Sequence, residues 1–389
     1  MPNKDKNIPK RRFKTFENDP AWELRKLGEV VEVCSGRDYK HLGVGSIPVY
    51  GTGGYMLSVS EALSKNNDAI GIGRKGTIDS PYILRAPFWT VDTLFYCIPN
   101  DGFTLEFAYS IFQNINWKSM DESTGVPSLS KNGINNVKVL TPKIKEQSAI
   151  GTFFSTLDRH ITLHQRKLDK LKSVKQAYLS EMFPAEGERV PKRRFPGFTD
   201  DWELRKLGEV ARFRRGSFPQ PYGNSEWYDG DGAMPFVQVA DVTDEMNLVG
   251  DTKQKISRKA QPLSVFAEEG SVLVTLQGSI GRVAITQYEA FIDRTVLIFE
   301  NFNLPVDNLF WAYIIKQKFI EEAKCAPGGT IKTITKEVLS DFDIKLPSHP
   351  EQSAIGSFFS TLDRHITLHQ RKLEKLKNLK KALLNELFV

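Results

Sequence analysis

The stretch FFSTLDRHITLHQRKL, residues 153–168, returns without a change at residues 358–373. It lies inside a longer repeat, because residues 146–183 and 351–388 are identical at 30 of 38 positions. A repeat this close indicates that one structural element has been copied within the chain. The fold must therefore contain this element twice.

A second kind of repeat precedes the first. PKRRF begins at Pro9 and again at Pro191, and WELRKLGEV begins at Trp22 and again at Trp202. Between these matching ends, the two long inner segments differ almost completely. We therefore interpret the chain as a tandem duplication in which the scaffold is repeated and the inner segments have diverged.

Each long repeat carries an apolar stripe whose members are alternately four and three residues apart. This average spacing of 3.5 residues is typical of a coiled-coil seam, and a helix with such a stripe has to bury it. The natural partner is the other copy, and a two-fold relation between the copies predicts an antiparallel pair. The predicted seam residues are Phe154, Leu157, Ile161, His164, Leu168, Leu171, Phe359, Leu362, Ile366, His369, Leu373 and Leu376.

The inner segments have the pattern of mixed α/β domains. In the first, SIPVYG, AIGIG and TLFYCI predict strands and LEFAYSIFQNI predicts a helix. In the second, PFVQVADV, SVLVTL, GRVAI and RTVLIFE predict strands and NLFWAYIIKQKFIEEAK a helix. Both share a Gly-Thr/Ser-Ile turn, at residues 76–78 and 278–280, and an aspartate followed by a threonine near a strand, at residues 92–93 and 293–295. The two domains are therefore predicted to be homologous.

The predicted fold class is α/β (α+β), with two homologous domains joined by two long helices in a pseudo-two-fold symmetric antiparallel coiled coil. The predicted segments are a basic N-terminal segment at 1–20, a first domain at 21–145, a central helix at 146–185, a linker at 186–201, a second domain at 202–350 and a C-terminal helix at 351–389.

Composition narrows the function classes only partly. The 389 residues are 40% apolar and 26% charged, with no run long enough to span a membrane and no secretory signal, which favours the cytoplasm. The three cysteines are too far apart for a disulfide framework or a metal site. The net charge is +6, but residues 21–145 carry 13 basic and 12 acidic groups and residues 202–350 carry 17 and 20. Charge alone therefore does not identify a DNA-binding protein.

The sequence GIGRKG, residues 71–76, matches a dinucleotide-binding pattern, but Pro81 prevents the helix that such a site needs. A better interpretation is that Arg74, Lys75 and Thr77 present donors to phosphates or guanine edges, or simply form a solvated hairpin tip. The complete set of candidate DNA-binding residues is Arg74, Lys75, Thr77, Ser128, Ser130, Lys131, Arg212, Arg214, Arg215, Lys253, Lys255, Arg258, Gln277, Ser279, Arg282, Lys332, Thr333 and Lys336.

No motif makes a convincing catalytic or metal site. His160 and His164 have a metal-pair spacing but lack the glutamate of an HExxH motif, so a structural role is favoured. His164 and His369 could fix the register of the seam or lie at its solvated edge. The Glu322 and Asp343 tripeptides of (D/E)xK form lack an upstream Pro-Asp partner. We therefore expect neither a catalytic residue nor a metal site in this chain.

The whole arrangement, from Trp22 to Val389, resembles the specificity (S) subunit of type I restriction-modification systems. The resemblance rests on FFSTLDRHITLHQRKL, ESTGVPSL, GRKGTI and PFW followed by DTLF. It implies that each inner domain is a target recognition domain for one half of an interrupted double-stranded DNA site. It also implies that the coiled coil is a spacer that docks two methyltransferase subunits. The subunit has no activity of its own in this family: partner methyltransferase and restriction subunits bring S-adenosylmethionine, ATP and Mg, and methylate adenine N6.

Apolar residues off the seam should then pack on the recognition domains or meet the methyltransferase. These are Phe153, Leu163, Val174, Leu179, Phe358, Leu368, Leu379 and Leu384. Two alternatives stay open: a stand-alone coiled-coil assembly protein whose domains bind protein or glycan, and a two-headed nuclease that depends on Glu322.

Overall fold

The computed structural model describes residues 7–325 and 335–388. The chain divides into two compact units: the first consists of residues 1–166 and 370–389, and the second of residues 167–369. Each unit therefore combines one inner segment with parts of both long repeats.

The two long repeats are continuous helices, α4 (Ile144–Met182) and α8 (His349–Leu387). Each starts two residues before the boundary predicted from the repeat, which was 146 or 351. A glutamine holds this earlier start: the side chain of Gln147 donates to the carbonyl of Pro142 at 2.9 Å, and that of Gln352 donates to the carbonyl of Pro347 at 3.0 Å.

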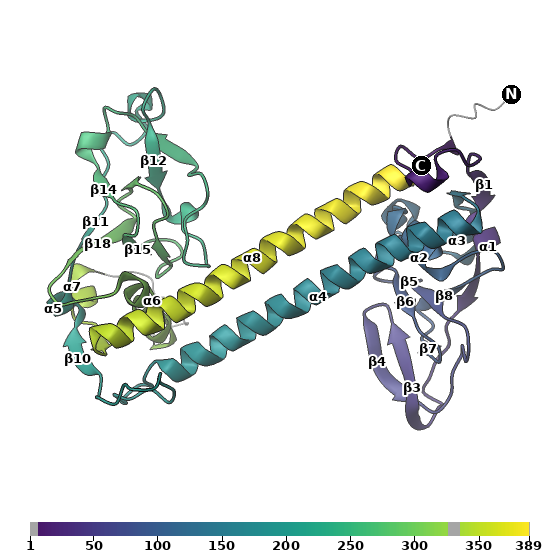
Figure 1. The fold of residues 1–389 in the computed structure, drawn as a ribbon, viewed down its shortest axis with the longest axis horizontal. Coiled ribbons are helices and arrows are strands. Elements are labelled where there is room, and N and C mark those ends of the chain that lie inside the picture. Colours follow the sequence, from purple (N-terminus) through teal and green to yellow (C-terminus); the bar gives the residue numbers. More distant parts are fainter. Residues whose placement is uncertain (1–6, 326–334, 389) are drawn as a thin grey trace. The chain divides into compact units, whose positions relative to one another are not determined.

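The first unit contains three sheets. A four-stranded antiparallel sheet has the order β2-β8-β5-β6, a smaller sheet has the order β4-β3-β7, and β1 pairs with β9. In Figure 1, the smaller sheet is the part of this unit that lies farthest from α4. The elements are η2 (Lys14–Phe16), β1 (Glu23–Lys26), α1 (Leu27–Val30), β2 (Val31–Ser35), β3 (Val44–Gly51), β4 (Gly54–Val59), β5 (Ala69–Gly73), β6 (Tyr82–Leu84), β7 (Trp89–Thr90), β8 (Leu94–Pro99), α2 (Leu105–Asn114), η3 (Trp117–Met120), α3 (Lys131–Asn136) and β9 (Lys138–Thr141).

The second unit repeats this plan, with one more strand, β14, in its smaller sheet. Its sheets have the orders β11-β18-β15-β16, β13-β12-β17-β14 and β10-β19. In both smaller sheets one pair is parallel, β3 with β7 and β12 with β17. The elements are β10 (Glu203–Lys206), α5 (Leu207–Val210), β11 (Ala211–Arg215), η4 (Ser225–Trp227), β12 (Met234–Val237), η5 (Val239–Asp241), β13 (Gln254–Ile256), η6 (Gln261–Leu263), β14 (Val265–Ala267), β15 (Val272–Thr275), β16 (Val283–Ile285), β17 (Ala290–Ile292), β18 (Val296–Phe302), α6 (Asn308–Cys325), α7 (Lys336–Ser340) and β19 (Asp343–Leu346).

The central strands and the inner helices form where the sequence predicted them. Strand β5 is buried at every position because Ile70 and Ile72 join the core that contains α2, while Ala69 packs with Leu84 and Phe88. One strand prediction was wrong: PFVQVADV leaves the strand after Val237 and turns into η5. The Asp241 carboxylate causes the turn, because it accepts the backbone N–H of Gln238 at 2.8 Å.

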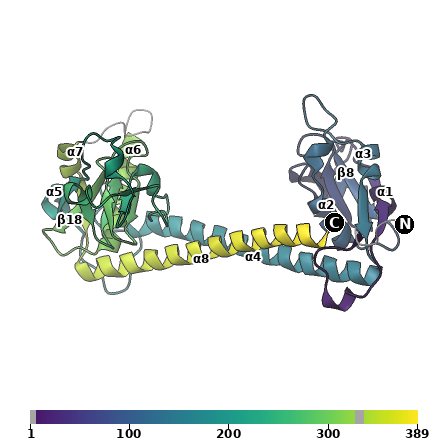
Figure 2. The ribbon, with the colours of Figure 1, turned by 90° about the horizontal axis from the view of Figure 1, so that it is seen from above.

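Within each unit, α4 and α8 lie side by side and run in opposite directions (Figure 2). In the first unit, Phe154 near the start of α4 shares a core with Leu384 and Leu387 at the end of α8. In the second unit, Met182 at the end of α4 shares a core with Ile355 near the start of α8. The antiparallel pairing predicted from the stripes is therefore confirmed in both units.

Four aromatic rings join the inner segment to the helices. In the first unit, Phe388 lies 6.0 Å from Trp22, 5.8 Å from Phe107 and 6.2 Å from Phe154, measured between ring centroids. The second unit repeats the group: Phe183 lies 6.0 Å from Trp202, 5.9 Å from Phe310 and 6.0 Å from Phe359. Each core is therefore completed by the last residues of the other repeat.

Over residues 7–325 and 335–388, none of the helices combines the length and the apolar character that crossing a membrane requires.

Candidate nucleic-acid interface

Two loops of the first unit are bound to each other through their backbones. The N–H of Gly76 donates to the carbonyl of Pro127 at 2.9 Å, and the N–H of Leu129 donates to the carbonyl of Arg74 at 3.0 Å. Lys75 and Ser128 form an isolated β-bridge between the same segments. The structure thus brings together candidates that are more than fifty residues apart in sequence.

Arg74 is held in one orientation although its side chain is exposed. Its guanidinium lies over the Phe95 ring, 5.8 Å from the centroid, and donates to the carbonyl of Asp92 at 3.5 Å. Its backbone N–H donates to the carbonyl of Thr93 at 2.8 Å. Lys75 and Thr77 beside it are also exposed. The loop therefore presents donors that a phosphate or a base edge can reach.

The remaining candidates in this unit differ in whether their polar groups are already hydrogen-bonded within the fold. Ser130 is the N-cap of α3: it accepts the N–H of Gly133 at 2.9 Å and donates to Glu122 at 2.7 Å, so its hydroxyl is already used. Lys131 is exposed at the start of α3. The backbone N–H groups of Ser128 and Ser123 donate to the Asp121 carboxylate and lower its pKa. These hydrogen bonds hold the loop around Asp121.

Sequence reasoning missed one further segment next to this loop, the β3–β4 turn. A Cβ on Gly76 would lie 4.0 Å from the hydroxyl of Thr52, which places the β3–β4 turn beside it. Tyr55 on β4 and Val126 on the partner loop are 62% and 66% exposed. The signal was present as GTGGY, a glycine-rich turn followed by an aromatic residue.

In the second unit, the corresponding loop joins β15 to β16 and carries Gln277 and Ser279, both exposed. Gly278 has a φ of 63°, a conformation that favours glycine. Arg282, a further candidate, is committed to an ion pair with Asp244 at 2.9 Å and donates to the carbonyl of Val242 at 3.4 Å. Its guanidinium is therefore less available to a ligand than that of an unpaired arginine.

The other basic candidates are spread over several elements. Arg212, Arg214 and Arg215 are exposed on β11, where Arg214 pairs with Glu300 at 2.5 Å. Lys255 pairs with Asp251 at 3.2 Å. Lys253, just before β13, and Arg258, just after it, are exposed, as is Lys336 at the start of α7. Lys332 and Thr333 lie outside the described residues.

The exposed Arg294 was not among the candidates, although it lies near the corresponding loop of the second unit. Arg294 lies between Asp293 and Thr295 in the connection from β17 to β18, with its guanidinium 5.5 Å from the centroid of the Tyr222 ring. The sequence comparison had matched Asp293 and Thr295 to Asp92 and Thr93, which are adjacent. In the second unit Arg294 is inserted between the aspartate and the threonine, and this insertion is visible in the sequence.

The predicted seam residues are all buried or half-buried. The eight off-seam residues fall into three groups. Leu163, Leu368 and Leu379 are 49%, 59% and 47% exposed, whereas Phe153, Val174, Leu179 and Phe358 are half-buried. Leu384 is buried in the core of the first unit, so its side chain offers no surface for docking.

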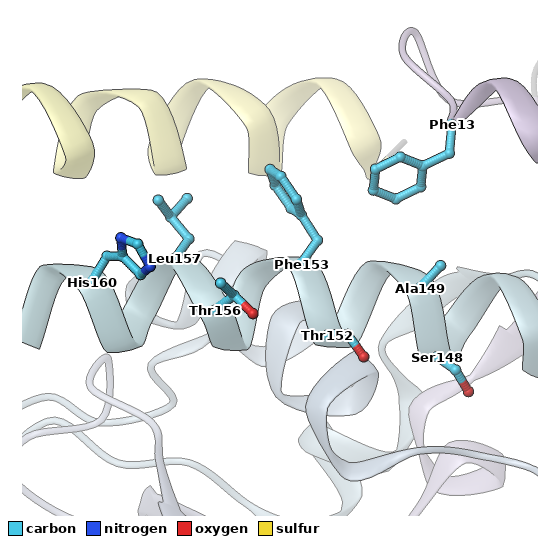
Figure 3. A pocket seen from close by; sticks show the side chains of 8 residues that line it. All are labelled: Phe13, Ser148, Ala149, Thr152, Phe153, Thr156, Leu157 and His160. Carbon is cyan, nitrogen blue, oxygen red and sulfur yellow. The ribbon is translucent and has the colours of Figure 1, made fainter.

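An apolar groove of about 630 Å³ lies along α4 in the first unit, where Phe153 and Leu157 point toward α8 (Figure 3). Phe13 closes one end of it, with its ring 5.7 Å from that of Phe153. The lining residues are Phe13, Ser148, Ala149, Thr152, Phe153, Thr156, Leu157 and His160. For metals, no group of three or more His, Cys, Asp or Glu side chains arranged to bind an ion occurs in the described part of the chain.

A family model for the type I restriction modification DNA specificity domain matches residues 20–173 and again residues 199–378. The two matches together cover most of the chain, and each includes one inner segment. The chain therefore belongs to this family, that of the type I restriction-modification specificity subunits, and contains its domain twice.

Two relatives from Methanocaldococcus jannaschii agree with this assignment. The chain is 24% identical over 279 residues to the putative type I restriction enzyme MjaX specificity subunit, and 22% identical over 282 residues to the type I restriction enzyme MjaVIII specificity subunit. The matches cover 71% and 69% of this chain but 63% and 65% of those proteins. The chain thus spans less than two thirds of the length of either relative.

Solved structures have the same fold. The type I restriction-modification S subunit from M. genitalium superposes with a TM-score of 0.70 over 98% of this chain and 99% of its own, at 15% identity. A chain from a type I R-M system, solved to explain complex assembly and conformational transition, gives a TM-score of 0.50 over 94% and 96%, at 18% identity. The predicted family and fold class are therefore confirmed.

Proposed function

We propose that this chain is the DNA-reading subunit of a type I restriction-modification complex, with each domain reading one half of an asymmetric, interrupted site. The observation that carries the proposal is that two domains of one topology present unlike residues at corresponding loops. The first presents Arg74 and Lys75, whereas the second has Leu276 and Gln277 at the equivalent positions. Different donors at equivalent places read different bases.

The paired helices act as the spacer between the two readers in this proposal. Two readers on one face of a duplex require half-sites about one helical turn, roughly 34 Å, apart. The bases between the half-sites are spanned without being read, and the length of the helices sets their number.

Catalysis is proposed to belong to partner subunits in the cytoplasm, where the DNA lies. Two methyltransferase subunits bind S-adenosylmethionine and methylate adenine N6, one on each strand, while restriction subunits use ATP and Mg. This chain contributes recognition and binds none of these cofactors itself.

The groove on α4 is the proposed docking surface for one methyltransferase subunit. It is apolar and lies beside the exposed Leu163, and an exposed patch of this kind marks an interaction site. Thr156→Arg, which places a charge in the groove, should abolish copurification of the methyltransferase, whereas Lys172→Glu on an exposed position should not. Equal copurification with both variants would exclude the groove.

Replacing residues 202–350 with a second copy of residues 21–145 tests the function directly. Such a chain has two identical readers, so with its methyltransferase partners it should methylate an interrupted palindrome built from the first half-site alone. Single-molecule sequencing of host DNA reports the methylated adenines for both chains. If the native chain directs no methylation with its partners present, it is an assembly protein rather than a DNA reader.

DNA affinity should depend on the partners. The two domains are nearly neutral, so counterion release by this chain alone is small and its own binding should be weak. Fluorescence anisotropy across a salt series, with and without the methyltransferase, measures this. Tight binding by the isolated chain at physiological salt would contradict the proposal.

A further inference from the structure

Arg294 is an exposed arginine on a rigid aromatic support. Its guanidinium stands 5.5 Å from the centroid of the Tyr222 ring, and it forms no ion pair within residues 7–325 and 335–388. By contrast, Arg214 and Arg282 in the same unit are neutralised by Glu300 and Asp244. Arg294 therefore keeps its charge and its donors available.

A partly buried hydrogen-bond network fixes the Tyr222 ring. The Tyr222 hydroxyl donates to Asp293 at 3.0 Å and accepts from the side chain of Gln238 at 2.8 Å. Asp293 is 2% exposed and also accepts the Thr295 hydroxyl at 2.5 Å. Burial, followed by the Asp293 carboxylate, raises the pKa of Tyr222 to about 12, so the phenol remains protonated and continues to donate.

The first unit also places an arginine over an aromatic ring, but with Arg74 and Phe95 in place of Arg294 and Tyr222. There the backbone N–H of Arg74 donates to the carbonyl of Thr93 at 2.8 Å; in the second unit the N–H of Leu276 donates to the carbonyl of Thr295, also at 2.8 Å. Leu276 stands where Arg74 should be, and it is buried. The arginine comes instead from the residue inserted between Asp293 and Thr295. Each unit thus presents one exposed arginine over an aromatic ring at the junction of the same two turns.

The chemistry of such an arginine is specific. A planar guanidinium donates two parallel hydrogen bonds, which match O6 and N7 of guanine in the major groove. Stacking on Tyr222 restricts its rotamers before DNA arrives, which lowers the entropic cost of binding. Gln277 and Ser279, in the loop that follows Leu276, are exposed polar neighbours that can contact the adjoining base pair.

We propose that Arg294 is the specificity-determining residue of the second recognition domain and that it reads a guanine of the second half-site, with Tyr222 as its positioning residue. This inference rests on the proposed function.

The test uses the full chain in complex with its methyltransferase subunits. Each guanine of the second half-site is replaced in turn by 7-deazaguanine, which lacks the N7 acceptor, and the methylation rate is measured. With the native chain, one position should slow methylation roughly 10- to 100-fold. With Arg294→Lys, which keeps the charge, native DNA should already be slow and the same replacement should have less than about a twofold further effect.

Two matched variants complete the experiment. Tyr222→Phe keeps the ring and removes the hydroxyl, so it should reduce discrimination at that guanine a few-fold without moving the specificity elsewhere. Arg74→Lys alters only the reader of the first half-site, so the fold reduction that 7-deazaguanine causes in the second half-site should stay as in the native chain. If the 7-deazaguanine effect survives in Arg294→Lys, or falls equally in Arg74→Lys, Arg294 is not the reader. If the native complex methylates without sequence preference, the proposed function itself fails.

Discussion

At the scale of residues, the second arginine in each copy of the PKRRF motif, Arg12 or Arg194, forms an ion pair within the fold. Arg12 makes two parallel hydrogen bonds to Glu146, at 2.8 and 2.6 Å, and Arg194 makes the same pair with Glu351. These carboxylates are almost fully buried. Glu146 raises the pKa of Arg12 through its hydrogen bonds, and the guanidinium stays charged. The basic N-terminal segment and the linker therefore tie each unit to the start of a long helix.

Breaking one of these pairs should be costly. Arg12→Ala leaves the Glu146 carboxylate buried without its partner, and the free energy of unfolding should fall by about 3–5 kcal/mol. Urea unfolding measures the change, and Arg194→Ala should behave alike. The control is Arg25→Ala, which removes an exposed pair with Glu23 and should cost about 0–1 kcal/mol. Equal losses for Arg12 and Arg25 would contradict this account.

The sequence identified the residue types that could contact DNA but not which of them are neutralised. Arg282 and Arg214 satisfied the same pattern as Arg74, yet their acidic partners Asp244 and Glu300 are distant in sequence. An ion pair between such positions follows from the tertiary fold, which local patterns do not encode. The placement of Arg294 also follows from the tertiary fold: the inserted residue is visible in the sequence, but its aromatic support comes from Tyr222, 72 residues earlier.

At the scale of elements, the helix pair carries two lysines at seam positions. Lys175 pairs with Asp363 in the second unit, and Lys380 pairs with Asp158 in the first. The two pairs are related by the repeat offset, and all four side chains are at least two-thirds buried. A slip of one helix along the other would break the pair and leave a buried lysine. The spacing of the stripe was readable from the sequence, whereas this register was not, because an apolar seam alone permits several registers.

The repeat provides a matched comparison of these pairs. Asp363 accepts hydrogen bonds from Lys175 and from the hydroxyl of Tyr313. Asp158 accepts the equivalent hydrogen bond from Lys380. Asp363→Asn should therefore lower the free energy of unfolding by about 1 kcal/mol more than Asp158→Asn, since one additional hydrogen bond to a charged group is weakened. Urea unfolding of both variants, with Tyr313→Phe as the control that removes the difference, measures this. Identical losses in the native background would show that the Tyr313 contact contributes nothing.

At the scale of the whole molecule, each unit depends on residues from both long repeats. The sequence predicted the duplication and the antiparallel pair, and those predictions were confirmed. It did not predict that Phe388 completes the core around Trp22, or that Phe183 completes the one around Trp202. The reason is physical: the repeat shows that these phenylalanines are equivalent, while their partners are decided by how an inner segment packs against a helix end.

Phe388→Ala should therefore destabilise the first unit, although most residues of that unit lie more than 200 positions earlier in the sequence. The side chain is 9% exposed, and its loss should cost about 3–5 kcal/mol. Hydrogen exchange locates the effect: amides of β5 and β8 in the first unit should exchange faster, while those of β15 and β18 should keep their native rates. Phe183→Ala should give the opposite pattern, and Leu379→Ala, on an exposed position of α8, should leave both units unchanged. Faster exchange in both units with either variant would refute the division of the cores.

The proposed role of the paired helices as a spacer gives the last prediction. One extra heptad inserted between Arg166 and Lys167 and another between Arg371 and Lys372 keep both stripes in phase, because the positions are equivalent in the two repeats. Seven residues add about 10.5 Å of helix, the length of about three base pairs, so the gap in the methylated site should grow by about three. Both half-sites should stay the same, because no recognition loop has changed.

Inserting four residues in α4 alone shifts the stripe out of phase and should abolish methylation instead. Single-molecule sequencing of methylated DNA distinguishes these outcomes, and an unchanged gap after the double insertion would mean that the helices do not set the spacing.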